Sequence, residues 1–88
     1  INLKICSNDY VENLIRGNSF YIQFSNIQTL DISLEIMNAQ GAKVFQKENL
    51  INQRTPQRIT VGNLSTGIYF VKVYANKKVY TQRVFITN

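Results

Sequence analysis

The sequence predicts an all-β domain, an antiparallel β-sandwich of about seven strands. Three observations support this prediction. Apolar and polar residues alternate with a period of two along much of the 88-residue chain, as half-buried antiparallel strands require. Residues typical of turns interrupt these runs at spacings of roughly 8–12 residues. No segment shows a sustained period of about 3.6 residues, which an amphipathic helix would need.

The N-terminal part of the chain contains two clear strand patterns and one ambiguous segment. Residues 2–6 alternate around Lys4, which predicts a first strand. Residues 10–16 fit either a strand or a short helical turn, and Gly17 ends this segment. Residues 19–24 predict the next strand, whose inward face carries Phe20, Ile22 and Phe24.

The middle of the chain predicts a hairpin followed by a separate strand. Residues 31–37 alternate cleanly, and their apolar positions are Ile32, Leu34 and Ile36. Gly41 accepts a positive φ without steric cost, so a hairpin to a strand at 43–48 is expected. Pro56 precedes a strand at 57–61, where it removes no hydrogen bond from a ladder. Ile59 and Val61 then face inward.

Two long β-rich runs, 68–75 and 78–87, end the chain and are separated by Asn76-Lys77. The corner before them contains Leu64, expected to anchor the loop in the core, and Gly67, expected to allow a tight bend. Tyr69 then begins an inward alternation. Its hydroxyl is expected to reach an upstream backbone group, which is the tyrosine corner of immunoglobulin-like sandwiches. The predicted fold is therefore an immunoglobulin-like antiparallel β-sandwich.

The composition argues against an enzyme. The chain has no histidine, so a hydrolytic triad lacks its base, and the five carboxylates are scattered. The single cysteine, Cys6, is expected to be a small buried hydrophobe. Neither a metal site nor a cofactor-binding motif is expected. With no run of about 18 apolar residues, membrane insertion is not expected either.

Positive charge is concentrated in the second half of the chain. Residues 49–88 contain no carboxylate and six cations, namely Arg54, Arg58, Lys72, Lys77, Lys78 and Arg83. Such asymmetry indicates either an anionic partner or a solvated basic face. A pI of about 9.6 raises the possibility of nucleic-acid binding. It is not expected, because Tyr69 lies on the predicted core face rather than on a stacking surface.

Three blocks of sequence, in order, resemble a known family. They are Asn38-Ala39-Gln40-Gly41-Ala42-Lys43-Val44-Phe45, then Leu64-Ser65-Thr66-Gly67-Ile68-Tyr69-Phe70-Val71-Lys72-Val73, then Lys78-Val79-Tyr80-Thr81-Gln82-Arg83-Val84-Phe85-Ile86. Together, over about residues 19–88, they resemble the C-terminal sorting domain of proteins exported by the type IX secretion system.

The resemblance implies a non-catalytic, folded export signal at the C-terminus of a larger cargo protein. The length of 88 residues predicts that residues 1–88 are one domain, and the initial Ile1 is expected to reflect processing or excision. The implied partners are an outer-membrane translocon and a cell-surface sortase. The implied route leads through the periplasm to the outer membrane, the cell surface or the extracellular space.

By this resemblance the terminal strand, Val79 to Asn88, is the part that the translocon reads. If that strand lies at a sheet edge, a partner strand can add to it, and a dimer can form in the same way; the other reading is a covered central strand. The candidate partner-binding residues are Lys72, Lys77, Lys78, Arg83, Val84, Phe85, Ile86, Thr87 and Asn88. Leu64, Gly67 and Tyr69 are the structural motif.

One difference from the family keeps an alternative open. Many members begin with a segment like Tyr-Pro-Asn-Pro, whereas residues 6–13 contain no proline. The alternative is a free-standing immunoglobulin-like adhesion or ligand-binding module of the bacterial cell envelope.

Overall fold

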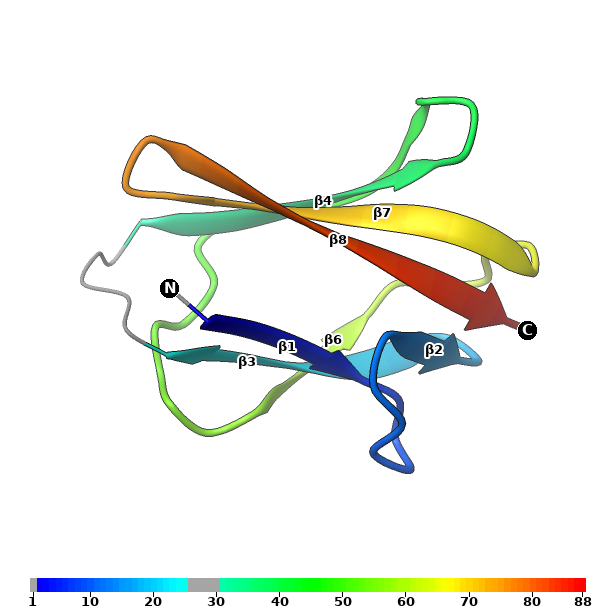
Figure 1. Ribbon diagram of the computed structural model, residues 1–88, viewed down its shortest axis with the longest axis horizontal. Coiled ribbons are helices and arrows are strands. Elements are labelled where there is room, and N and C mark those ends of the chain that lie inside the picture. The colour runs from blue at the N-terminus through cyan, green and yellow to red at the C-terminus, as the bar shows by residue number, and fades with distance from the viewer. Residues whose placement is uncertain (1, 26–30) are drawn as a thin grey trace.

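The computed structural model describes residues 2–25 and 31–88 and shows a two-layered β fold (Figure 1). One layer contains β1 (Asn2–Cys6), β2 (Leu14–Arg16), β3 (Ser19–Ser25) and β6 (Gln57–Thr60). The other contains β4 (Ile32–Asn38), β5 (Lys43–Lys47), β7 (Gly67–Ala75) and β8 (Lys78–Thr87). The predicted sandwich is thereby confirmed, with eight strands among the described residues instead of about seven.

Within each layer the strands pair antiparallel. β3 pairs with β1 on one side and β6 on the other, while β8, β7, β4 and β5 are neighbours in that order. This matches an immunoglobulin-like arrangement, in which the penultimate strand lies between the last strand and a strand from the middle of the chain.

The layers are joined by one parallel pair, β2 with β8, whose register is Leu14↔Phe85, Ile15↔Ile86 and Arg16↔Thr87. The prediction of a purely antiparallel sandwich is wrong at this pair. The ambiguous segment 10–16 is also settled here, because only Leu14–Arg16 forms a strand. Tyr10 and Asn13 instead have positive φ values of 65° and 59°, which break both a strand and a helical turn.

The core lies between the layers and contains the inward positions that the alternation predicts. Phe20, Ile22 and Phe24 of β3 are at most 1% exposed. The β4 and β7 strands supply the opposite face with Ile32, Leu34, Ile36, Tyr69, Val71 and Val73. Cys6 is buried and free, as expected. Burial of these side chains is the main favourable term in folding, roughly 1.5–3 kcal/mol for each large one.

A polar cluster holds the loop between β1 and β2 against the core. Ser7 and Ser19 are the buried polar residues of the described chain. The Ser19 hydroxyl accepts hydrogen bonds from Asn8 Nδ2 (3.0 Å) and from the Arg58 guanidinium (3.2 Å from the terminal nitrogen). The Ser7 hydroxyl donates to Asp9. Because these buried groups are bonded, the loop between β1 and β2 leaves no buried side-chain polar atom of the described residues without a partner.

The β7–β8 turn predicts a stabilising substitution. Asn76 and Lys77 have φ values of 53° and 64°, which suits the two-residue hairpin turns in which both central residues are left-handed. The left-handed conformation costs a residue with a Cβ about 1–2 kcal/mol. Glycine avoids this cost but loses more chain entropy, about 0.5–1 kcal/mol. We expect Lys77→Gly to raise the free energy of unfolding by about 0.5–1 kcal/mol, measured by urea denaturation.

The matched control is Lys78→Gly, which removes the same charge one residue later, inside β8. It should lower the free energy of unfolding, because glycine weakens a strand. Equal effects of the two substitutions would show that the turn conformation is not the source of the gain.

Candidate functional site

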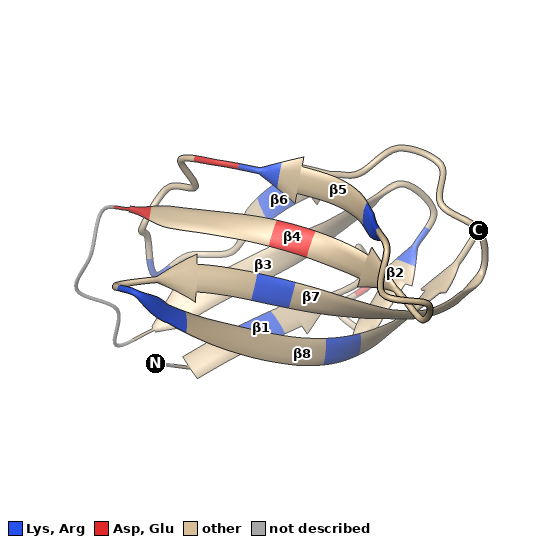
Figure 2. Ribbon diagram, turned by 90° about the horizontal axis from the view of Figure 1, so that it is seen from above, with Lys and Arg blue, Asp and Glu red and all other residues tan. Residues whose placement is uncertain are grey.

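The four cations singled out by the sequence lie along the β7–β8 hairpin in two groups. Lys72 pairs with Thr81 across the ladder, which makes Arg83 its diagonal neighbour on the outward face, at a spacing of about 7–8 Å. Lys77 and Lys78 lie at the turn, and both are exposed. Figure 2 shows the cationic positions along β7, β8 and their turn. The hairpin therefore presents positive charge along its length.

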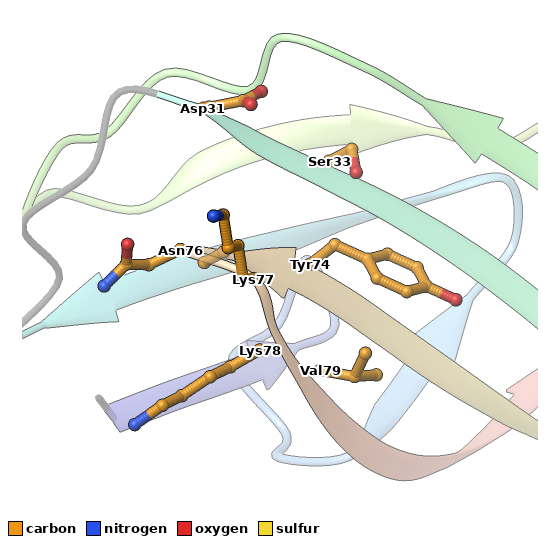
Figure 3. A pocket seen from close by; sticks show the side chains of 8 residues that line it. Asp31, Ser33, Tyr74, Asn76, Lys77, Lys78 and Val79 are labelled. Carbon is orange, nitrogen blue, oxygen red and sulfur yellow. The ribbon is translucent and has the colours of Figure 1, made fainter.

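A shallow hollow of about 430 Å³ lies beside this turn (Figure 3). It brings the turn next to the beginning of β4 and is lined by Asp31, Ser33, Tyr74, Ala75, Asn76, Lys77, Lys78 and Val79. The side chains of Tyr74 and Val79 come from paired positions of β7 and β8. Within residues 2–25 and 31–88, there is no group of three or more His, Cys, Asp or Glu that could hold a metal ion.

Glu35 is the carboxylate at the centre of the outward face of this layer, and its charge is already compensated. The Tyr74 hydroxyl donates a 2.6 Å hydrogen bond to Glu35 Oε1, and Lys43 Nζ lies 3.5 Å from Oε2. Lys72 pairs with Glu35 across the ladder. The hydrogen bond from Tyr74 is the main cause that lowers the pKa of Glu35, and the nearby lysines lower it further. The same bond raises the pKa of Tyr74.

On the side that faces away from β7, about the first two thirds of the last strand, β8, are not paired with another strand of the described chain. Phe85 N donates to Asn13 O at 3.0 Å, so the backbone groups of Phe85 point away from β7. Backbone direction alternates along a strand. The N–H and C=O groups of Val79, Thr81 and Arg83 therefore point toward the same side, where no strand of the described chain pairs with them. We call this stretch of β8, residues 79–83, the open edge.

For the last residues of the chain, the structure selects the second of the two readings that the sequence left open, a covered strand. The last three residues of β8, Phe85, Ile86 and Thr87, pair with β2 on one side. On the other side, Phe85 and Ile86 also pair with β7. The side chains of Val84 and Ile86 are buried at 2% and 0% exposure. This end of β8 is a covered strand, so a partner strand cannot add to it without displacing β2.

Deleting residues 84–88 would remove core side chains and the layer junction together. Asn88 is exposed, and its N–H is bonded to Thr66 Oγ1 at 2.9 Å. This bond ties the end of β8 to the corner before β7.

The corner before β7 is built as the motif suggests. The Tyr69 hydroxyl donates a 2.7 Å hydrogen bond to the Ser65 carbonyl, a contact of about 1 kcal/mol. Leu64 is half-buried and packs against the core, and Gly67 is the first residue of β7. These residues position the start of the hairpin and lie apart from its open edge.

Sequence reasoning did not single out Glu35 or Tyr74, and it included Val79 and Thr81 only as members of the terminal strand. The alternation places all four on outward positions, but their importance depends on which strand lies opposite and which edge is free. Neither can be read from a single strand's pattern.

The bond between Tyr74 and Glu35 predicts a pH effect. Since the pKa of Glu35 is lowered in the folded state, its ionised form contributes stability above the ordinary pKa of 4.5. That contribution is lost as the pH falls through the lowered pKa. We expect Tyr74→Phe to raise the pKa of Glu35, measured by NMR titration of its carboxyl carbon. We also expect the stability difference from the wild type to vanish at acidic pH.

The control is Tyr80→Phe, which removes a tyrosine hydroxyl from β8 that forms no hydrogen bond within the described residues. It should leave the Glu35 titration unchanged. An unchanged titration in Tyr74→Phe would contradict the assigned cause.

Comparison with known proteins gives one family. The model of the secretion system C-terminal sorting domain matches residues 16–87. No curated protein matches the chain. Among the described residues, no helix is long and apolar enough to cross a membrane.

A solved structure of PorZ is similar in fold. Its description is an essential bacterial surface component of the type-IX secretion system of Porphyromonas gingivalis. The TM-score is 0.59 at 19% identity, and the match covers 86% of this chain but 11% of the PorZ chain. The chain thus corresponds in fold to a small part of that longer protein.

The family match covers all three sequence blocks, the tyrosine corner and the whole β7–β8 hairpin. No finding favours the alternative of a free-standing adhesion module. The chain belongs to the secretion system C-terminal sorting domains, the signals that direct an attached protein across the outer membrane to the cell surface or extracellular space.

Proposed function

We propose that this domain is a non-catalytic C-terminal tag that an outer-membrane translocon of the type IX system recognises by adding a strand to the open edge of β8. This proposal rests on the backbone N–H and C=O groups of Val79, Thr81 and Arg83. These groups point away from β7, toward a side where no strand of the described chain pairs with them. An unpaired strand edge offers a partner main-chain hydrogen bonds that require no particular side chains. One translocon can thereby read many cargo-bearing domains.

The attached cargo and the later cleavage complete the proposal. Residues 1–88 act as one domain at the end of a larger exported protein, and a cell-surface sortase separates the two. The domain supplies no catalytic group to that step. In support, the chain lacks histidine, and Asp9 and Glu35 are both engaged by neighbouring hydroxyl and cationic groups.

A second copy of the domain is the competing occupant of the open edge. Edge-to-edge pairing of two copies would bring Lys78 and Arg83 close to the cations of the other β8. Like charges facing each other across strands are destabilising, and charged edges limit self-association. The cations therefore favour a partner of opposite charge over a dimer.

A proline at the open edge tests the proposal. Proline is tolerated on an edge strand where its N–H would face solvent. Thr81→Pro should therefore preserve the β7–β8 ladder while removing one donor and blocking an added strand. With residues 1–88 fused behind a periplasmic reporter in a bacterium that has a type IX system, we expect surface export to fall at least about tenfold.

Thr81→Val keeps the backbone donor and is the matched control, which should be exported normally. Circular dichroism of the purified variants checks that both are folded. Normal export of a folded Thr81→Pro variant would reject strand addition, whereas failure of the wild-type fusion to be exported would reject the sorting function itself.

The cations predict a rate effect. Exposed ion pairs contribute only about 0–1 kcal/mol each, so the four cations should speed association more than they strengthen the complex. We expect replacement of Lys72, Lys77, Lys78 and Arg83 by Gln to slow association with the purified translocon component at least about tenfold at low salt. The difference should narrow at high salt, and stopped-flow fluorescence measures it.

Replacement of Lys4, Lys43, Lys47 and Arg54 by Gln removes the same charge away from the hairpin. This control should associate faster than the hairpin variant at low salt. Equal rates for both variants would assign the effect to net charge instead of to the hairpin.

A further inference from the structure

The outward face of the β4–β5–β7–β8 layer exposes apolar side chains next to the end of the open edge. Ile68 and Phe85 are cross-strand partners on β7 and β8, and they are 38% and 44% exposed. Phe70 pairs with Arg83 in the adjacent outward position, and Met37 of β4 pairs with Phe70 on its other side. We call Ile68, Phe70, Arg83 and Phe85 the outer-face cluster.

The outward face of the other layer differs. Its cross-strand pairs Asn2 with Ser25 and Lys4 with Gln23 are polar. Its exposed aromatic side chain, Tyr10, already stacks on Tyr21, with the ring centroids 5.9 Å apart. Exposed apolar groups that gather on one face of a small domain mark a surface for a partner. Phe85, in contrast, stacks on no other aromatic ring within the described residues.

A groove of about 390 Å³ runs beside the cluster and is lined by Asn13, Ile68, Gln82, Arg83, Val84 and Phe85. Gln82 Nε2 donates to Asn13 Oδ1 at 2.7 Å, and Phe85 N donates to Asn13 O. These bonds hold Asn13, the residue before β2, at the end of the open edge. A strand added at residues 79–83 would therefore lead into this groove.

The charge of the cluster indicates the chemistry of its occupant. Within the described residues, the Arg83 guanidinium forms neither an ion pair nor a hydrogen bond. Lys72 is its diagonal neighbour, and Glu35 is already bonded to Tyr74 and Lys43. An arginine beside apolar side chains binds a carboxylate in two parallel hydrogen bonds, and these strengthen when water is excluded.

We propose that the outer-face cluster binds a protein segment of the secretion machinery in which an Asp or Glu lies next to an aromatic or long aliphatic side chain. The carboxylate binds Arg83, and the apolar side chain packs between Ile68 and Phe85. This inference rests on the proposed function for the identity of the machinery. A second copy fits poorly, because it would bring another Arg83 and Lys72 instead of a free carboxylate.

Photocrosslinking in the exporting cell tests the partner. Phe85 is replaced by benzoylphenylalanine, which keeps an aromatic ring at that position, and Tyr21, a half-exposed aromatic of the other layer, is replaced in the control. We expect a light-dependent adduct with a protein at position 85, with Asp or Glu within a few residues of the linked site. Arg83→Glu should lower its yield at least about fivefold, whereas Arg54→Glu should not.

Titration of the isotope-labelled chain tests the chemistry without export. The probe is the peptide acetyl-Ser-Glu-Phe-Glu-Leu-Glu-Ser-amide, and its control has Lys in place of Glu. We expect NMR shifts centred on residues 68, 83 and 85 with the acidic peptide alone, and their loss in Arg83→Glu.

Each other outcome overturns the inference. An adduct mainly with lipid would identify a membrane surface, and one with another copy of the chain would identify a dimer face. Equal adducts at positions 21 and 85, or no shifts with the acidic peptide, would show that the cluster is not a specific site. Normal export with no protein adduct at position 85 would overturn this inference alone and leave the sorting function standing.

Discussion

The parallel pairing of β2 with the end of β8 is the interaction on which the rest of the structure depends. It joins the two layers, and it covers the backbone edge of Phe85–Thr87 while residues 79–83 stay unpaired on the side that faces away from β7. The chain reaches β2 through left-handed residues at Tyr10 and Asn13 and through the polar cluster around Ser19. Because the edge of β8 is divided in this way, its end contributes to stability, and its first part is the edge at which we propose recognition.

The domain closes its sandwich without a disulfide. Cys6 is buried and unpaired, and the hydrogen bond from Tyr69 to Ser65 closes the corner before β7. The C-terminal Asn88 is tied to the same corner through Thr66. Contacts of about 1 kcal/mol each matter in a domain of this size, whose total stability is only about 5–15 kcal/mol. They hold β7 and β8 in register up to the end of the chain.

The outward face of the β7–β8 layer combines features that a merely soluble domain has no need to expose together. Ile68 and Phe85 are partly exposed beside an arginine without a counterion in the described chain. Burying such side chains against a partner gains apolar contact, and pairing the arginine adds orientation. The open edge supplies hydrogen bonds that are independent of side chains, so edge and face together would give both general and specific recognition.

The sequence by itself determined the fold class, seven of the eight strand positions to within about two residues, the inward residues and the tyrosine corner, because alternation and turn chemistry are local properties. It also carried the family resemblance in its three blocks. Only the tertiary structure decided that Leu14–Arg16 forms a strand, that this strand runs parallel to β8, and that Val84 and Ile86 are buried. It likewise decided that Tyr74 meets Glu35. These features depend on which strands become neighbours, and neighbours are chosen by the packing of distant segments, which no single run of residues records.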